Sequence, residues 1–560
     1  MGTFAQLCAI AGVASILSIG VFPQYRQFFV GSPGYILAFV QFLILEVALW
    51  GLWLVILYPR YFSPLKHLPQ PEGNSFFMGQ WPILRNEKTG RPLQRWINDI
   101  PNTGLIKYLY MFNYELLMVC SPSALREVLV TKCYDFEKPK PLSRLAIHFF
   151  GLGMPFVEGD AHKFQRKMMA PAFAFKHIKD LYPTFWDMST EIVSILTEEV
   201  KKGAGTPKET NGNISPVAPD QAVLEIVRWW KAITLDIMGV AGMGQDFKSR
   251  YSENHPLRQA YFNLFRPSWE AAYAVFVRLV VPLWAFKYIP IKMNAVMEQS
   301  RETIRDNCLQ LIRTKSAQLA KNELTDLDIL SCAIQSGGFT EQGLIDQMTI
   351  FLLAGHESSS VAMTWATYAL CQYPEVQTRL RAEIRASLPS PSGATNVTSL
   401  DIEHIPYLTA VCSEVMRFYD VFVWTFREAV TDTTVLGQRI PKGTQLVIPV
   451  SAMHRDRKIW GDDADSFNPD RWMPGKVNSS LGGADSNFAF MTFNQGPRIC
   501  IGESFARAEF ACLLAAWVGR FEFELNDPRE LDDKNYILAG GFGVGPVNGL
   551  DLKVRIIDGW

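Results

Sequence analysis

The chain is poor in cysteine and carries almost no net charge. Its 560 residues include nine cysteines, and none of them forms a Cys-x-x-Cys pair. This count argues against a disulfide scaffold and fits a reducing compartment better. Lysine and arginine number 54 against 55 aspartates and glutamates, which gives a net charge of −1. Such a balance provides no overall attraction for nucleic acid, so we expect no nucleic-acid partner.

The N-terminus lacks the basic residues that open a signal peptide, because no lysine or arginine precedes Arg26. It contains instead two apolar runs, at residues 4–22 and 34–58. Either run could cross a bilayer, for which roughly 20 residues suffice, although the first could also be a buried or interfacial helix. Arg60 and Lys66 follow the second run and favour the cytosol for everything beyond it. Residues 1–58 are therefore predicted to form a membrane anchor.

The rest of the chain shows no internal repeat and no break between independently patterned halves. Residues 59–71 contain several prolines and cannot be helical throughout, which predicts a stiff hinge after the anchor. Hydrophobic residues make up 48% and charged residues 19% of the chain, a composition typical of a globular protein with a membrane part. We expect residues 72–560 to form one large domain.

Residues 493–502 read Phe-Asn-Gln-Gly-Pro-Arg-Ile-Cys-Ile-Gly and lead into an apolar helical pattern at residues 503–518. An isolated cysteine is usually a buried residue in an ordinary turn. Here Cys500 lies at a predicted helix N-terminus, where the dipole and free N–H groups favour a thiolate. Arg498 provides a cation, Phe493 an aromatic shield, and Gly502 room for a flat group. Together they suit axial ligation of heme iron, with Arg498 on a propionate.

This F-x-x-G-x-R-x-C-x-G spacing resembles the heme-binding loop of the cytochrome P450 family, in which the cysteine thiolate is the proximal iron ligand. The resemblance extends in collinear order over residues 60 to 555. It implies an α+β, mostly α-helical heme-thiolate fold with small β-sheets and an N-terminal membrane anchor.

A basic helical stretch contains His162 and Arg166, which share one helical face and can reach the same anion. The alternative is a solvated basic helix. The resemblance implies that both residues contact heme propionates, and that Arg427 is a further propionate contact.

Residues 345–370 form a long apolar helical pattern interrupted by Ala-Gly-His-Glu-Ser-Ser at 354–359. In the family this helix crosses the distal face of the heme, and an acid followed by threonine handles oxygen and protons. Glu357 and Ser358 occupy these positions, with serine replacing the usual threonine. The alternative for Ser358 is a hydroxyl bonded back to the carbonyl of Ala354.

Glu414 and Arg417 form an E-x-x-R pattern, which has little specificity alone. Because it precedes Phe-Asn-Pro-Asp-Arg-Trp at 467–472, the resemblance implies a structural network of Glu414, Arg417 and Arg471. The family often has Tyr-Pro-Pro after this pattern, whereas this chain has Tyr-Asp-Val at 419–421, which predicts an unusual loop over the substrate.

The implied function is a microsomal monooxygenase that inserts one oxygen atom from O2 into a hydrophobic small molecule. The implied cofactor is heme b, reduced by NADPH through a membrane-bound reductase, with cytochrome b5 as an additional partner. Several landmarks resemble fungal members that tailor terpenoids or polyketides in secondary metabolism. The expected location is the endoplasmic reticulum membrane, with the catalytic domain facing the cytosol. Two alternatives are a reductase-independent isomerase or dehydratase and a non-catalytic heme sensor.

Overall fold

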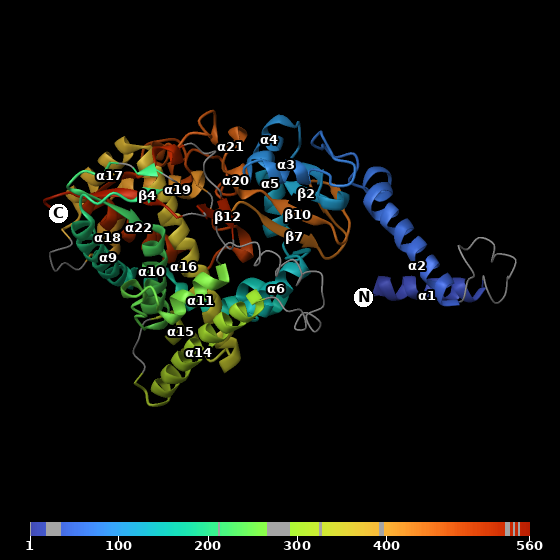
Figure 1. Cartoon of the computed structure of the whole chain (residues 1–560), viewed down its shortest axis with the longest axis horizontal. Helices are drawn as coiled ribbons and strands as arrows, with labels where there is room; N and C mark the ends of the chain where they lie inside the picture. The colour runs from blue at the N-terminus through green and yellow to red at the C-terminus, as the bar shows by residue number, and fades with distance from the viewer. Residues whose placement is uncertain are drawn as a thin grey trace.

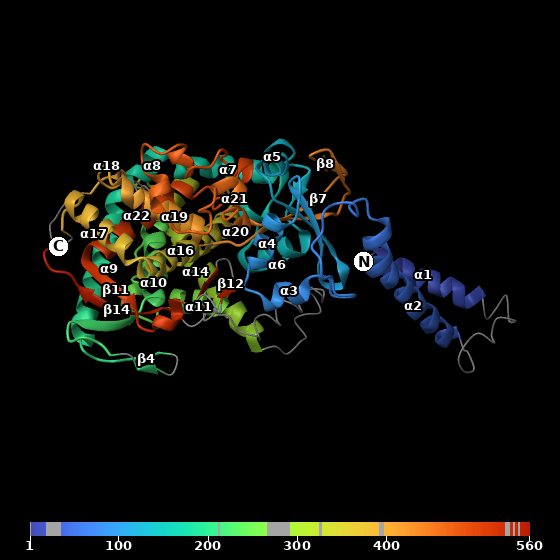
Figure 2. The same ribbon diagram turned by 90° about the horizontal axis from the view of Figure 1, so that it is seen from above.

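The computed structural model shows a mostly helical body with a helical arm at its N-terminal side (Figure 1). It describes residues 2–17, 35–210, 213–214, 216–265, 292–323, 328–390, 397–419, 421–531, 538–540, 544–546 and 549–560. A small sheet lies near the arm, and the C-terminus lies at the opposite end of the body (Figures 1 and 2). The predicted α+β, mostly helical fold is confirmed.

The arm consists of α1 (Gly2–Ile16) packed against α2 (Tyr35–Leu52), which continues as the π-type helix η3 (Trp53–Phe62). Residues 37–62 contain an 18-residue window with a mean hydropathy of 2.2 and form a candidate membrane span. At 1.5 Å per residue their length is about 39 Å, more than the roughly 30 Å of a hydrocarbon core. This helix matches the second predicted run. The first run begins in α1, but its end lies outside the described residues.

The arm is fixed to the sheet by side chains that donate to backbone carbonyls around Pro59. Pro59 itself has no N–H to donate within the helix. The Asn113 side chain donates to the Val55 carbonyl at 2.8 Å, and the fully buried Lys107 donates to the Pro59 carbonyl at 2.8 Å. The helix therefore continues to Phe62, so the proline-rich segment leaves it at Ser63.

The largest sheet has strand order β1-β2-β10-β7-β3, with β10 parallel to β2 and the other pairs antiparallel. Its strands are β1 (Leu105–Leu109), β2 (Glu115–Val119), β10 (Gln445–Ile448), β7 (Thr425–Ala429) and β3 (Phe136–Glu137). A second sheet joins β11 (Phe521–Leu525), β14 (Asp551–Ile556) and β6 (Gln221–Glu225). The hairpins are β4 (Glu209–Thr210) with β5 (Asn213–Ile214), β8 (Thr433–Val435) with β9 (Gln438–Ile440), and β12 (Leu538–Gly540) with β13 (Val544–Pro546).

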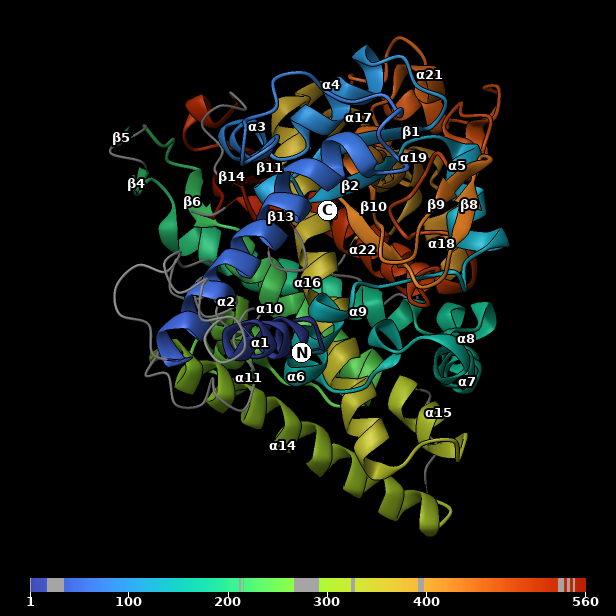
Figure 3. The same ribbon diagram turned by 90° about the vertical axis from the view of Figure 1, so that its right-hand side faces the viewer.

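Helices form the rest of the core, and α14 borders one edge of the body (Figure 3). They are α3 (Trp81–Asn86), α4 (Arg91–Asp99), α5 (Pro122–Arg126), α6 (Lys140–Phe150), α7 (Gly159–Met169), α8 (Phe175–Asp180), α9 (Tyr182–Gly203), α10 (Val227–Ile237), α11 (Pro256–Phe265), α14 (Lys292–Ala320), α15 (Ile329–Gln335), α16 (Glu341–Gln372), α17 (Pro374–Ser387), α18 (Ser399–Glu403), α19 (Pro406–Phe418), α20 (Val450–Met453), α21 (Arg457–Trp460) and α22 (Glu503–Arg520). Helix α16 is buried along most of its length because it is apolar on nearly all sides, and it packs against α10, α14, α19 and α22.

The structure brings Glu414, Arg417 and Arg471 together in a buried network. Arg417 forms a bidentate pair with Glu414, at 2.7 and 2.8 Å, and donates to the carbonyl of His454 at 2.7 Å. Arg471 and the Trp472 indole donate to the same carboxylate, at 3.3 and 2.8 Å. The network ties α19 to the irregular chain that precedes the cysteine loop.

Replacing Arg417 by alanine should destabilise the protein by about 3–5 kcal/mol, because it leaves the carboxylate of Glu414 buried with most of its charge uncompensated. Urea unfolding followed by circular dichroism would measure the loss. Arg439→Ala is the control, since its pair with Asp432 is 70% and 57% exposed and should contribute only about 0–1 kcal/mol. Equal losses in the two variants would show that the buried network has no special role.

Candidate active site

The loop at residues 493–502 turns back on itself and leads into α22. The N–H of Cys500 donates to the Phe493 carbonyl at 2.8 Å, across the short helix η12 (Gly496–Arg498). Gly496 has a φ of +77°, and a Cβ there would lie 2.2 Å from the Leu129 carbonyl oxygen, so a larger residue would not fit. A Cβ on Gly502 would lie 4.0 Å from the Cys500 sulfur, so this glycine faces the thiol.

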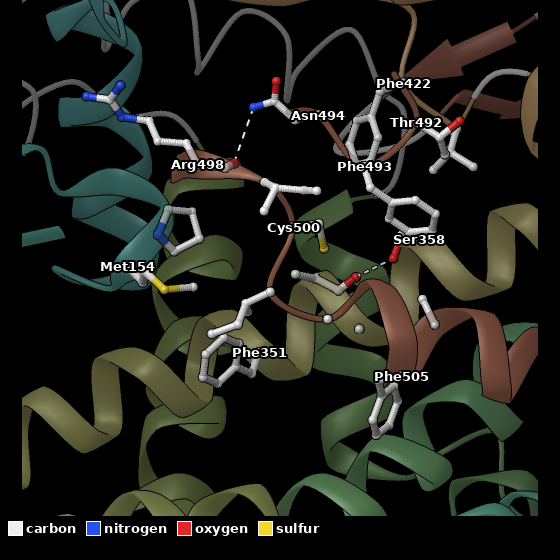
Figure 4. A pocket seen from close by; sticks show the side chains of 18 of the residues that line it. Met154, Phe351, Ser358, Phe422, Thr492, Phe493, Asn494, Arg498, Cys500 and Phe505 are labelled. Atoms are coloured by element: carbon white, nitrogen blue, oxygen red, sulfur yellow. Dashed lines mark hydrogen bonds between the residues drawn. The ribbon is translucent and has the colours of Figure 1, made fainter. Parts of the chain in front are cut away.

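A cavity of about 400 Å³ lies between this loop and α16 (Figure 4). The accessible surface of Cys500 opens into it, although protein surrounds the thiol on its other sides. Burial raises the pKa of the Cys500 thiol, whereas the Gly502 N–H and the Arg166 guanidinium act in the opposite direction. The wall on α16 is one helical stripe: Ile350, Phe351, Ala354, Gly355, Ser358, Ser359 and Ala362.

Five basic side chains line the same cavity, namely Lys138, His162, Arg166, Arg427 and Arg498. Burial, followed by repulsion from other cations, lowers the pKa of Lys138 to about 8 and that of His162 to about 4. Burial and then Arg498 lower the pKa of Arg427 to about 10. The carboxylate of Glu158 contacts two of these cations, lying 2.6 Å from Arg498 and 3.4 Å from Lys138. Its two neighbours lower the pKa of Glu158 although burial alone would raise it.

This arrangement fits heme. One carboxylate offsets only part of the positive charge described around the cavity, which leaves positions for the two propionates of heme. Within the described chain, the buried Nε of Arg498 has no hydrogen-bond partner. The apolar wall suits a macrocycle, and Cys500 offers to the cavity a thiol of the kind that would hold heme iron. The predicted cofactor residues His162, Arg166, Arg427, Phe493, Arg498, Cys500 and Gly502 all line this one cavity.

The two predicted catalytic residues on α16 point in different directions. Ser358 lines the cavity, and its hydroxyl donates to the Ala354 carbonyl at 2.5 Å. Glu357 is buried and does not line the cavity. Its carboxylate lies 3.4 Å from Lys231 of α10 and 3.7 Å from the ring of His356. Burial lowers the pKa of that histidine, so its ring is neutral near pH 7.

Sequence reasoning missed several residues of the site. Lys138 is one of the basic side chains that line the cavity, and Glu158 forms an ion pair with it. Phe422 and Trp424, from the chain after α19, extend the apolar wall. A weak signal existed for the first, because the Lys-Pro-Lys-Pro run at 138–141 places Lys138 just before a helix that can begin at these prolines. The pairing of Glu158 left no signal, since its partners are distant in sequence.

Known proteins resemble the chain over almost its whole length. The family model described as "Cytochrome P450" matches residues 69–548. Cytochrome P450 monooxygenase sphH of Aspergillus fumigatus is 40% identical over 91% of this chain and 91% of its own length. The monooxygenases buaD of Petromyces alliaceus and FUM15 of Gibberella moniliformis are 38% and 37% identical, each over at least 90% of both chains. The chain therefore belongs to the cytochrome P450 family, and like these relatives it is an oxidoreductase of the monooxygenase class.

Proposed function

We propose that Cys500 is the axial ligand of a heme in the cavity and that Arg166, Arg427, Arg498 and His162 hold its propionates. The observation that carries this proposal is a thiol that faces a largely apolar cavity with a surplus of buried and partly buried cations. When bound, the heme supplies the oxygen chemistry, in which one atom of O2 enters the substrate and the other leaves as water. The Gly502 N–H and the Arg166 guanidinium favour the thiolate at Cys500.

Cys500→Ala should abolish the red-shifted Soret band that thiolate-ligated heme gives when reduced and bound to carbon monoxide. Cys332→Ala, which changes a half-buried cysteine outside the cavity, should retain that band. With NADPH, reductase and 18O2, the wild type should add one 18O atom to substrates chosen from terpenoids, polyketides and fatty acids. A thiolate-type band in Cys500→Ala would refute the ligand assignment. Product formation without NADPH would favour the isomerase or dehydratase alternative.

The substrate we propose is a hydrophobic small molecule of fungal secondary metabolism, a terpenoid or a polyketide. The cavity wall opposite the basic rim is apolar and includes Met238, Ile350, Phe422 and Trp424. Burying such a surface against an apolar ligand contributes about 25 cal/mol per Å². The fungal origin of the relatives supports a role in secondary metabolism.

Within the reaction, Ser358 would supply a hydroxyl proton to the cavity and Glu357 would replace it. Ser358 Oγ must then turn away from the Ala354 carbonyl, to which it now donates. Lys231 holds the Glu357 carboxylate on the far side of α16, so Glu357 must leave this ion pair to reach Ser358. Breaking the Ser358–Ala354 hydrogen bond and the Glu357–Lys231 ion pair would therefore control when the proton is supplied.

Ser358→Ala should release more hydrogen peroxide per NADPH consumed, because a hydroxyl donor is lost from the cavity. Ser358→Thr is the matched variant and should preserve coupling, since it keeps the hydroxyl and restricts χ1. Glu357→Gln should slow NADPH-dependent turnover and leave substrate binding unchanged. Parallel assays of NADPH oxidation, peroxide and product measure these effects. Unchanged coupling in Ser358→Ala would mean that its hydroxyl serves only the helix.

We further propose that η3 inserts in the endoplasmic reticulum membrane with the body on the cytosolic side. Exposed aromatic side chains surround the end of this helix, where they would meet the interface: Tyr61, Phe62, Phe76, Phe77 and Phe112. The reductase, or cytochrome b5, would bind near Lys163 and Lys167 on α7, next to the basic rim.

This topology predicts that the sequons at Asn213, Asn396 and Asn478 carry no glycan in cells. Asn478 is exposed, so it would be open to the transferase if the body faced the lumen. Treatment with endoglycosidase should leave the electrophoretic mobility unchanged. A fusion carrying a cleavable signal sequence in place of residues 1–62 is the positive control. A glycan on the native chain would reverse the proposed orientation.

A further inference from the structure

One acidic side chain, Glu158, connects three separate segments of the chain behind the basic rim, the five basic side chains that line the cavity. It directly precedes α7, and 16% of its side chain is exposed. Its Oε1 accepts the backbone N–H of Lys138 at 3.1 Å and lies 3.4 Å from the Nζ of the same lysine. Its Oε2 lies 2.6 Å from a terminal nitrogen of Arg498. Glu158 thereby joins the chain between β3 and α6 to the start of α7 and to the cysteine loop.

The position of the Arg498 side chain depends on this pairing. It extends away from Cys500 (Figure 4), and 7% of it is exposed. One terminal nitrogen donates to the Cys133 carbonyl at 2.6 Å, and the other meets Glu158. The buried Nε has no hydrogen-bond partner among the described residues. Because both terminal nitrogens are held by protein, the Nε N–H stays available for an anion.

Glu158 also offsets part of the charge of the basic rim. Four of the five basic side chains are cations at pH 7, because His162, with a pKa of about 4, is neutral there. Burial and repulsion from other cations lower the pKa of Lys138 and of Arg427, and the carboxylate of Glu158 opposes both shifts. With the two propionates of a heme, three carboxylates would face these four cations. Without Glu158 the rim would be more positive by one charge.

A negative charge close to a heme opposes the uptake of an electron, and water screens a buried charge less than an exposed one. Asp160 provides the comparison within the same turn of chain. Its side chain is 96% exposed and pairs with Lys163 at the surface. Glu158 and Asp160 therefore carry the same charge at the same end of α7, but only Glu158 is mostly shielded from water.

We propose that Glu158 is a positioning residue that holds Lys138 and Arg498 in the basic rim, and that its negative charge lowers the reduction potential of the heme bound there. Glu158 does not line the cavity, so it acts through these two cations and through its charge. The inference rests on the proposed function, because the basic rim must hold the heme propionates for this charge to lie near the heme.

Redox titration of the purified, heme-loaded protein tests the effect of the charge. Glu158→Gln keeps the shape of the side chain and an oxygen that can accept the Lys138 N–H, but it removes the charge, so the reduction potential should shift to a more positive value. The titration is done at pH 6, well below the pKa of about 8 of Lys138, to keep the lysine protonated. Asp160→Asn is the matched control and should leave the potential unchanged, since water already screens that acid.

A variant of opposite charge provides a second test of the same argument. Lys138→Met removes a cation from the basic rim and should shift the reduction potential to a more negative value. The double variant, with Glu158→Gln and Lys138→Met together, removes one charge of each sign and should return close to the wild-type potential. A double variant that differs from the wild type more than either single variant does would overturn the charge argument.

The rate at which heme passes to excess apomyoglobin tests the positioning role separately. Glu158→Asp keeps the charge but is shorter by one methylene, so it cannot reach Lys138 and Arg498 together. It should keep the wild-type reduction potential and lose heme faster by about tenfold, which corresponds to about 1.4 kcal/mol. Heme loss at the wild-type rate would overturn the positioning role.

The outcomes separate this inference from the proposed function. A normal thiolate-type CO band in Glu158→Gln, together with an unchanged reduction potential or with an equal shift in Asp160→Asn, would overturn this inference alone. A normal band with a positive shift in Glu158→Gln only would support it. Absence of a thiolate-type band from the wild type would overturn the proposed function and this inference with it.

Discussion

The position of the cysteine loop depends on one buried carboxylate. Glu414 has no exposed surface, and it holds Arg417 so that the guanidinium reaches the carbonyl of His454. The ring of His454 in turn accepts the N–H of Met491 at 2.8 Å, two residues before the loop. Between α21 and α22 the described chain forms only short 3-10 turns, so these side-chain hydrogen bonds hold it in place instead of regular backbone hydrogen bonds. An ion pair that stabilises little by itself thus fixes where the thiol lies.

Local spacing identified pairs of groups, and the family resemblance implied that these pairs meet. His162 and Arg166 share a helical face, and the loop motif placed Arg498 beside Cys500, but only the resemblance predicted that both pairs line one cavity. The partner of Arg498, Glu158, is 340 residues away and belongs to no motif. Contacts of that kind depend on how α7 packs against the loop, which periodicity does not encode.

Sequence position alone did not determine the geometry of the Glu357–Ser358 pair or the start of the hinge near Pro59. Glu357 and Ser358, the predicted acid and alcohol, follow each other in sequence, but adjacent helical residues point about 100° apart, and Lys231 holds the acid on another face. Pro59 was expected to begin a hinge, yet the helix passes through it to Phe62. A proline disrupts a helix through its missing N–H and its ring, and here Asn113, from a turn in the sheet, adds a hydrogen bond to the Val55 carbonyl of the same helix.

Two polar side chains of α16, Glu357 and Ser359, lie in different electrostatic environments. On one face Glu357 meets Lys231, an ion pair that keeps charge at the boundary with α10. On another face Ser359 meets Glu509, where burial without a cation favours a neutral acid. Two similar carboxyls at one helix thus lie in contrasting surroundings, one next to a lysine and the other fully buried against a hydroxyl. Ser358 and Ser359 both line the cavity, so each acid lies next to a cavity residue although neither carboxyl lines the cavity itself.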